Sequence, residues 1–296
     1  MRTKTIDPLV SNLIESKLDR VRSGETITMQ SQCGMSAIDA ITWQAAMILE
    51  GRRSIITRSQ TKLSKANGSE WINRGLTLSP ANEASDYFVG KFNHCPFATV
   101  SCIFACVGSA TGQGALPSSK IARIGRTLAM HHNFDAWFSL LRSEINKELA
   151  KCMRLEKKTG KKHKLAFRTN VASDNVTLAD DLCNSFPDSA PIEFYDYTVI
   201  PKAVGSSYVQ RVYSRKENNH DQCLEILESG YGIAVVFVGA IPARWNGYPV
   251  IDGDVNDLWF TRAPEHGGFV VGLKVKGSNK QKQACINSGF AVDVRA

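Results

Sequence analysis

The sequence predicts an α/β protein: a β/α barrel, or a partial barrel, of about seven strands with an N-terminal helical extension. Two observations favour this fold. From about residue 56 onward, short apolar runs typical of strands alternate with segments of helical periodicity. One run, Ile233–Val238, is apolar throughout and has glycines near both ends. That pattern is typical of a strand buried on both faces of a parallel sheet. An open doubly wound sheet is the main alternative.

Residues 1–55 are predicted to form the helical extension, and residues 56–296 the barrel-like domain. In Asp7–Arg22, apolar residues recur at helical spacing, and Ser36–Leu49 is a second helical segment rich in Ala, Ile and Met. A polar stretch over 57–69 then separates these helices from the rest of the chain.

The remaining elements follow in order. The clearest helix is Phe134–Lys158, because apolar side chains from Trp137 to Met153 share one face and Gly160 stands just beyond the end. The other predicted helices are Ser119–Met130, Leu178–Asn184 and Asp221–Glu228. The predicted strands are Trp71–Leu78, Lys164–Val171, Ile192–Thr198, Gln210–Ser214, Ile233–Val238, Tyr248–Asp252 and Phe269–Lys274. Because the last connections are short, we expect some of the last strands to pair antiparallel.

The chain carries a net charge of +8, from 36 Lys and Arg against 28 Asp and Glu. This balance is compatible with a polyanionic partner, and we predict a nucleic acid or a nucleotide as substrate. The positive charge is concentrated in two runs, 154–164 and 274–282. A solvated helix end or loop explains each run about as well as a track of phosphate contacts does.

No apolar run is long enough to span a bilayer, and no apolar signal region follows the first charged residues. These features predict a cytoplasmic protein with no membrane partner. The eight cysteines would then stay mostly reduced, which favours metal binding over disulfides. The sequence does not indicate an oligomeric state.

The most informative motif is a loop with three cysteines, Cys95, Cys102 and Cys106, followed by a glycine-bearing run over 107–114. One loop with these spacings can fold three thiolates around a point. The thiolates could hold an iron–sulfur cluster with one iron left open, or a zinc ion whose fourth ligand comes from elsewhere. His94 is a candidate for that fourth zinc ligand. Simple packing and a redox pair are the alternatives.

In β/α folds the working residues lie at the carboxyl ends of strands, because the loops there converge on one face. Charged side chains at predicted strand ends are the candidate catalytic residues: Asp174, Asp196, Asp252, Asp254, Glu217 and Lys274. Amide and hydroxyl side chains nearby are the candidate cofactor-binding residues: Asn170, Ser173, Tyr195, Tyr197, Ser214 and Asn218. The acids could hold a divalent ion, act as general acid and base, or bind ribose hydroxyls. Helix caps and turns are the structural alternatives for individual members.

From about residue 56 to its end, the chain resembles a family of uncharacterised bacteriophage proteins known only by a gene-product name. The matching segments include the cysteine loop over Asn93–Cys106, Arg168–Asp174, Phe194–Thr198 and Gly247–Asp254. The resemblance implies a phage origin, and hence the cytoplasm of an infected bacterial host. It also implies that the cysteines and the strand-end polar residues form one recurrent pattern, but it supplies no settled activity.

The chain is less closely similar to radical-SAM enzymes, which also place a three-cysteine loop after the first strand of a β/α barrel, though with shorter spacing. This likeness implies an iron–sulfur cluster and S-adenosylmethionine. We therefore predict a phage enzyme that modifies nucleic acid or a nucleotide. One alternative is a zinc-containing enzyme that exchanges DNA bases, with Asp174, Asp196 or Asp252 as nucleophile. Another is a non-catalytic protein that binds nucleic acid or a host protein.

Overall fold

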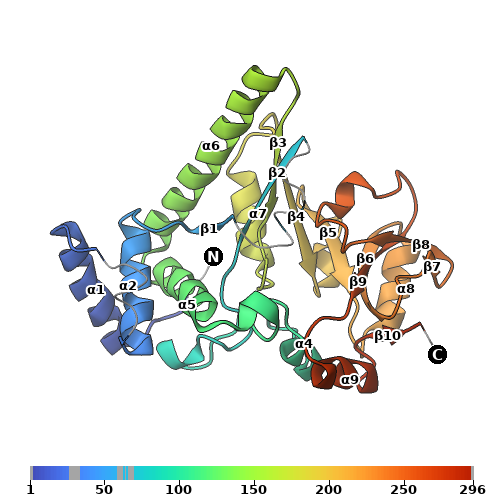
Figure 1. Ribbon diagram of the computed structural model, residues 1–296, viewed down its shortest axis with the longest axis horizontal. Helices are drawn as coiled ribbons and strands as arrows, with labels where there is room; N and C mark the ends of the chain where they lie inside the picture. Colours follow the sequence, from blue (N-terminus) through green and yellow to red (C-terminus); the bar gives the residue numbers. More distant parts are fainter. Residues whose placement is uncertain (1–2, 27–33, 59–62, 64, 66–69, 295–296) are drawn as a thin grey trace.

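The computed structural model describes residues 3–26, 34–58, 63, 65 and 70–294. Its centre is a mostly parallel sheet of ten described strands, with helices packed against it (Figure 1). The strands are β1 (Ile56–Thr57), β2 (Trp71–Leu76), β3 (Lys164–Arg168), β4 (Ile192–Thr198), β5 (Gln210–Ser214), β6 (Gly232–Val238), β7 (Arg244–Trp245), β8 (Tyr248–Asp252), β9 (Phe269–Lys274) and β10 (Val292–Asp293). The predicted α/β class is confirmed.

The strands are ordered β1-β2-β3-β4-β5-β6-β9-β8-β7 across the sheet, and β10 pairs with β6. From β2 to β6, strands consecutive in the chain are parallel neighbours. A doubly wound sheet would reverse its order, and this one does not over that span. The described strands do not close on each other, so a closed barrel is not confirmed. The antiparallel pairs are β1–β2 and β7–β8 at the two edges, whereas β8 and β9 are parallel.

The described helices are α1 (Pro8–Arg22), α2 (Ala37–Leu49), α4 (Val100–Phe104), α5 (Pro117–His132), α6 (Phe134–Thr159), α7 (Val176–Asn184), α8 (His220–Glu228) and α9 (Asn279–Asn287). Every helix predicted from periodicity is present. Two helices were not predicted. The first, α4, lies inside the cysteine loop and has only five residues, while α9 lies partly in the second basic run. Helix α4 is too short to show an apolar period, and α9 has few apolar residues, so neither has a clear apolar face in the sequence.

Local sequence explains where the longer helices begin and end. The Asp7 carboxylate accepts a hydrogen bond from the backbone N–H of Leu9 and caps α1. The Ser36 hydroxyl caps α2 in the same way. Gly160 ends α6 with a φ of 70°, a left-handed conformation that favours glycine over residues with a side chain. None of the described helices has a stretch long and apolar enough to cross a membrane.

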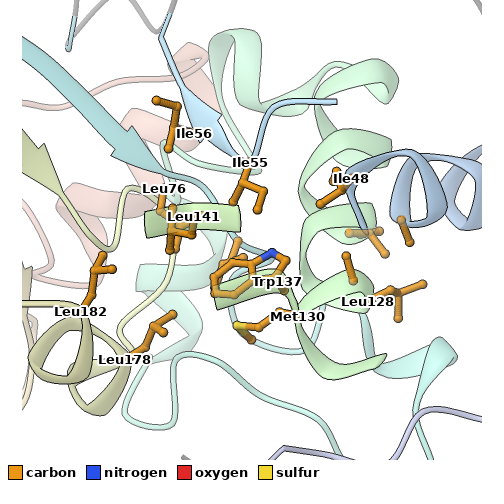
Figure 2. Close-up of a cluster of buried hydrophobic side chains, with 14 of the residues drawn as sticks. Ile48, Ile55, Ile56, Leu76, Leu128, Met130, Trp137, Leu141, Leu178 and Leu182 are labelled. Carbon is orange, nitrogen blue, oxygen red and sulfur yellow. The ribbon is translucent and has the colours of Figure 1, made fainter. Parts of the chain in front are cut away.

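The largest hydrophobic core lies between the helices and one face of the sheet. Figure 2 shows Trp137 and Leu141 of α6 between Leu128 of α5 on one side and Leu182 of α7 on the other, and all four are fully buried. Ile48 of α2 belongs to the same core. The two N-terminal helices therefore pack directly against the rest of the protein. The domain boundary near residue 55 stays a prediction.

An ion-pair network ties α6 to the sheet on this helix-covered face. The Glu148 carboxylate accepts from Arg58 Nε and from Arg74 Nε, both at 2.9 Å. The side chains of Glu148 and Arg74 are only 8% and 7% exposed. Because Arg74 is in β2, the network fixes the strand that leads into the cysteine loop.

The opposite face of the sheet is covered by the segment between β8 and β9. Trp259 and Phe260 from this segment pack with Trp71 and Tyr195 from the sheet, in a second hydrophobic cluster. Helices cover one face and an irregular segment covers the other. The carboxyl ends of the strands, where the cysteine loop lies, form the rim between these two layers.

Candidate active site at the cysteine loop

The cysteine loop lies against the carboxyl end of β3. Thr99 caps α4 by accepting a hydrogen bond from the backbone N–H of Cys102 at 3.2 Å. The Cys95 thiol donates to the Ala172 carbonyl, in the loop after β3, at 3.8 Å. A Cβ at Gly108 would meet the Ala172 Cβ at 2.3 Å. Glycine at this position is therefore what allows the two loops to touch.

Two of the three thiols are strongly affected by burial. Burial is the main cause that raises the pKa of Cys95 to about 12, and the neighbouring Cys106 and Asp174 act in the same direction. Burial also raises the pKa of Cys102 to about 12; there Cys106 adds to the rise and Lys216 opposes it. The backbone N–H of Asp174 donates to the His94 carbonyl at 3.0 Å, directly before Cys95, and a Cβ at Gly108 would lie 3.6 Å from the Cys106 sulfur. The cysteine loop therefore lies against the segment that carries Asp174.

Among the described residues, no group of three or more His, Cys, Asp or Glu side chains is arranged to hold a metal ion. His94, the candidate fourth zinc ligand, pairs instead with His131, with the two Nε2 atoms 3.1 Å apart. The rings of Phe88 and Phe92 pack around this pair. Burial lowers the pKa of His94 to about 4, so the pair is neutral at neutral pH. A single zinc ion does not fit these side chains.

The loop between β3 and α7 is held by its own polar groups. Asn170 donates to the Asp196 carboxylate at 2.5 Å and accepts from the Ser173 hydroxyl at 2.8 Å. One Asp174 oxygen accepts from the backbone N–H of Val199 at 3.0 Å. Its other oxygen is buried and has no hydrogen-bond partner among the described residues. Asp174 is therefore the member of this group that has an acceptor left for a ligand.

Asp196 lies on the helix-covered face of β4 and is 1% exposed. Its second oxygen accepts from the backbone N–H of Tyr197 at 2.9 Å. Burial raises the pKa of Asp196 to about 8. Such a carboxyl can hold a proton at neutral pH, but its surroundings make it a support for the Asn170 loop rather than a group open to substrate.

Lys216 is a site residue that the predicted set lacks. It follows β5, is 8% exposed, and donates from Nζ to the Phe97 carbonyl of the cysteine loop at 2.8 Å. Its neighbour Glu217, which was predicted, has one buried carboxylate oxygen with no hydrogen-bond partner within the described part of the chain. The Ser214 carbonyl accepts from Asn219, and Asn218 is exposed. The strand-end rule that selected Glu217 applies equally to Lys216.

Tyr195 and Tyr197 point to the other face of β4, into a buried polar cluster. The Tyr195 hydroxyl donates to Asp257 at 3.1 Å, and the Tyr197 hydroxyl donates to Asp257 at 3.3 Å. Arg168 donates to Asp257 at 2.9 Å, and its guanidinium lies over the Tyr197 ring. Asp257 is fully buried. This cluster fastens the covering segment to β3 and β4. The cofactor-binding role of the two tyrosines stays a prediction.

The acidic turn after β8 belongs to the other half of the sheet. The Asp252 carboxylate accepts from the backbone N–H of Asp254 at 2.8 Å. Asp254 in turn accepts from the backbone N–H of Lys274 and from Lys276 Nζ, at 2.9 and 3.2 Å. These bonds describe a self-contained turn. The predicted residues therefore form separate groups, and the cysteines share theirs with Asp174 and Lys216.

Arg123 of α5 holds the glycine run that follows the cysteines. It is 2% exposed and donates to the Gly114 carbonyl at 2.7 Å. Its other nitrogens form a two-pronged ion pair with Glu83, at 2.5 and 2.6 Å. The far end of the loop is thereby fixed to the helical layer.

The family model described as Gene product 88 matches residues 54–294 of the chain. This range contains the cysteine loop and all ten described strands, and leaves α1 and α2 outside. No curated protein and no solved structure matches the chain.

Proposed function

The chain belongs to the Gene product 88 family, and we propose that it is an enzyme that holds an iron–sulfur cluster and modifies a nucleic acid or a nucleotide. The cluster ligands are Cys95, Cys102 and Cys106. One observation carries this proposal: the cysteine loop contacts the segment after β3 through Cys95 and the segment after β5 through Phe97, which accepts from Lys216, at the carboxyl ends of parallel strands. Enzymes built on such sheets place their reacting groups at that rim.

We propose a cluster and not one zinc ion because His94, the candidate fourth zinc ligand, is paired with His131. Three cysteines can hold an iron–sulfur cluster without a fourth protein ligand. Three cysteines would also leave one iron open. Once bound, the cluster would supply one-electron chemistry at that iron.

Charged side chains near the cysteine loop are compatible with a bound cluster and its cofactor. The Lys216 ammonium is buried and offsets negative charge on the thiolates. Asp174 and Glu217 each have a buried carboxylate oxygen without a hydrogen-bond partner among the residues described. These oxygens can accept from the amino group or ribose hydroxyls of a nucleoside-containing cofactor. S-adenosylmethionine is the cofactor that we propose.

The topology of the sheet is compatible with the proposed likeness to radical-SAM enzymes. The cysteine loop follows β2, and the strands from β2 to β6 are neighbours in the sheet in the same order as in the chain. This order is compatible with a partial β/α barrel, and we propose that the cysteine loop lies at its mouth, as the radical-SAM likeness implies. The net charge of +8 supports a polyanionic substrate.

Metal analysis of protein purified without oxygen tests the proposal. We expect iron and sulfide with visible absorption, and loss of both in Cys95→Ser, Cys102→Ser and Cys106→Ser. Cys183→Ser is the matched control, since Cys183 is half-buried and lies in α7, outside the cysteine loop of the sequence. A colourless wild-type protein without iron would refute the cluster, and equal loss in the control would refute the ligand assignment.

A further inference from the structure

The outer face of the cysteine loop is apolar and exposed. In α4, the side chains of Val100, Ile103 and Phe104 are 85%, 43% and 41% exposed, and their spacing places them on one side of the helix. Phe97 and Val107 flank the helix and are both more than half exposed. We call these five residues the apolar patch. Exposed apolar groups gathered on one short segment mark a binding surface.

Two exposed lysines lie on or just before α9, the helix beside the apolar patch. Helix α9 lies beside α4 (Figure 1), and Gln281 of α9 donates to the carbonyls of Phe104 and Ala110. Lys276 and Lys280, just before and within α9, are exposed. Asp254 pairs with Lys276, but no ion pair is found for Lys280 within the described part of the chain. The surface thus combines apolar side chains, two of them aromatic, with positive charge.

The position of the patch limits what can occupy it. Cys102 lies in α4 itself, and Phe97 presents its carbonyl to Lys216. Whatever covers the patch therefore lies one layer of side chains from the cysteine site. A second copy of this basic chain would be repelled by the lysines. A substrate with negative charge and flat apolar faces would be attracted by both features.

We propose that the apolar patch, together with Lys276 and Lys280, binds a single-stranded nucleic acid and presents one of its bases to the cysteine site. This inference rests on the proposed function and names its substrate as a polynucleotide. Single strands bind where a positive surface follows the phosphates and exposed side chains stack on bases. A duplex hides its base faces, and enzymes that act on a base must take it out of the stack.

Fluorescence anisotropy with labelled single-stranded DNA and RNA oligonucleotides, and with the duplex of the same sequence, tests this inference. We expect single strands to bind more tightly than the duplex, and binding to weaken as salt increases. Val100→Asp and Lys280→Glu should each weaken single-strand binding about tenfold. Matched controls carry the same changes elsewhere: Leu9→Asp, at a 74% exposed residue of α1, and Lys147→Glu on the exposed side of α6.

Each outcome supports or overturns the inference. Equal weakening in the controls would show a general effect of charge and overturn the placement. Duplex binding as tight as single-strand binding would overturn the choice of substrate. If no oligonucleotide binds, or if binding does not depend on Val100, the surface is not a nucleic-acid site and the inference fails. Unchanged melting temperatures exclude misfolding of the variants.

The same preparations separate this inference from the proposed function. Iron and sulfide are measured on the protein used for anisotropy, and oligonucleotide binding does not require the cluster. If the protein contains no iron but still binds single strands through the apolar patch, the cluster is refuted and the nucleic-acid surface is not. If the protein contains a full cluster but shows no binding that depends on the patch, the nucleic-acid surface is refuted and the cluster is not.

Discussion

Replacing Glu148 with alanine tests how α6 is fastened to the sheet. Burial by itself raises the pKa of this carboxyl, but the hydrogen bond from Arg58 and the charge of Arg74 outweigh it and leave the pKa below its usual value. The ionised form is therefore the stabilised one. Its contribution is fully present above the carboxyl's unfolded pKa of about 4.5 and is lost as the pH falls below it.

The size of the effect follows from burial. Removing one partner of a buried ion pair costs about 3–5 kcal/mol, because the remaining charge stays in a poorly solvated place. With about 2 °C per kcal/mol for a large domain, Glu148→Ala should lower the melting temperature by about 6–10 °C at pH 7. Thermal melting followed by circular dichroism measures this shift, and urea unfolding provides an independent check.

An exposed ion pair provides the matched control. Arg20 and Glu25 are bonded at 2.6 Å, but their side chains are 53% and 40% exposed. Glu25→Ala should leave the melting temperature unchanged within error, since water screens such pairs. The double change Arg74→Met with Glu148→Leu should recover most of the lost stability, because it removes both buried charges. Equal shifts for Glu148→Ala and Glu25→Ala would refute the reasoning.

Three further predictions concern the core and the loop. Burial lowers the pKa of His94 to about 4 and of His131 to about 3. As the pH is lowered from 6.5, the free energy of unfolding should therefore decrease by about 1.4 kcal/mol per pH unit for each histidine, because the unfolded chain binds the protons first. Changing both histidines to Gln should flatten this slope in urea titrations. Leu141→Ala should cost about 3 kcal/mol in the same assay, because the side chain is fully buried (Figure 2); a loss below about 1 kcal/mol would contradict the packing. Arg123→Met should speed amide hydrogen exchange in 107–116 by releasing the loop, and exchange equal to wild type would contradict its role.

Much of the secondary structure was predictable from local pattern. Helix α6 shows its apolar face and its terminal glycine within the sequence itself, and β6 is a continuous apolar run. Two-residue strands such as β1 and β7 carry no such pattern, because they are too short to show a period and are held by pairing with a neighbour. The parallel pairing of β8 with β9 also depends on a partner that local sequence does not name.

Some residues of the candidate site could be predicted from the sequence, and others could not. The three cysteines stand out by their spacing, and the strand-end rule reached Asp174 and Glu217. That rule could not separate Asp174, which has a carboxylate oxygen without a described partner, from Asp196, whose oxygens both accept hydrogen bonds. The two carboxyl groups look alike in sequence. Only their neighbours in space give them different surroundings.

By itself, the order of amino acids determined the helices with strong periodicity, the main strands, the excess of positive charge and the spacing of the thiols. Each of these is a property of residues near one another in the chain. Tertiary structure alone decided that Lys216 reaches Phe97 and that Arg168 meets Asp257, pairs 119 and 89 residues apart. Such contacts form only when sheet packing brings distant segments together, since a local pattern holds no information about a distant partner.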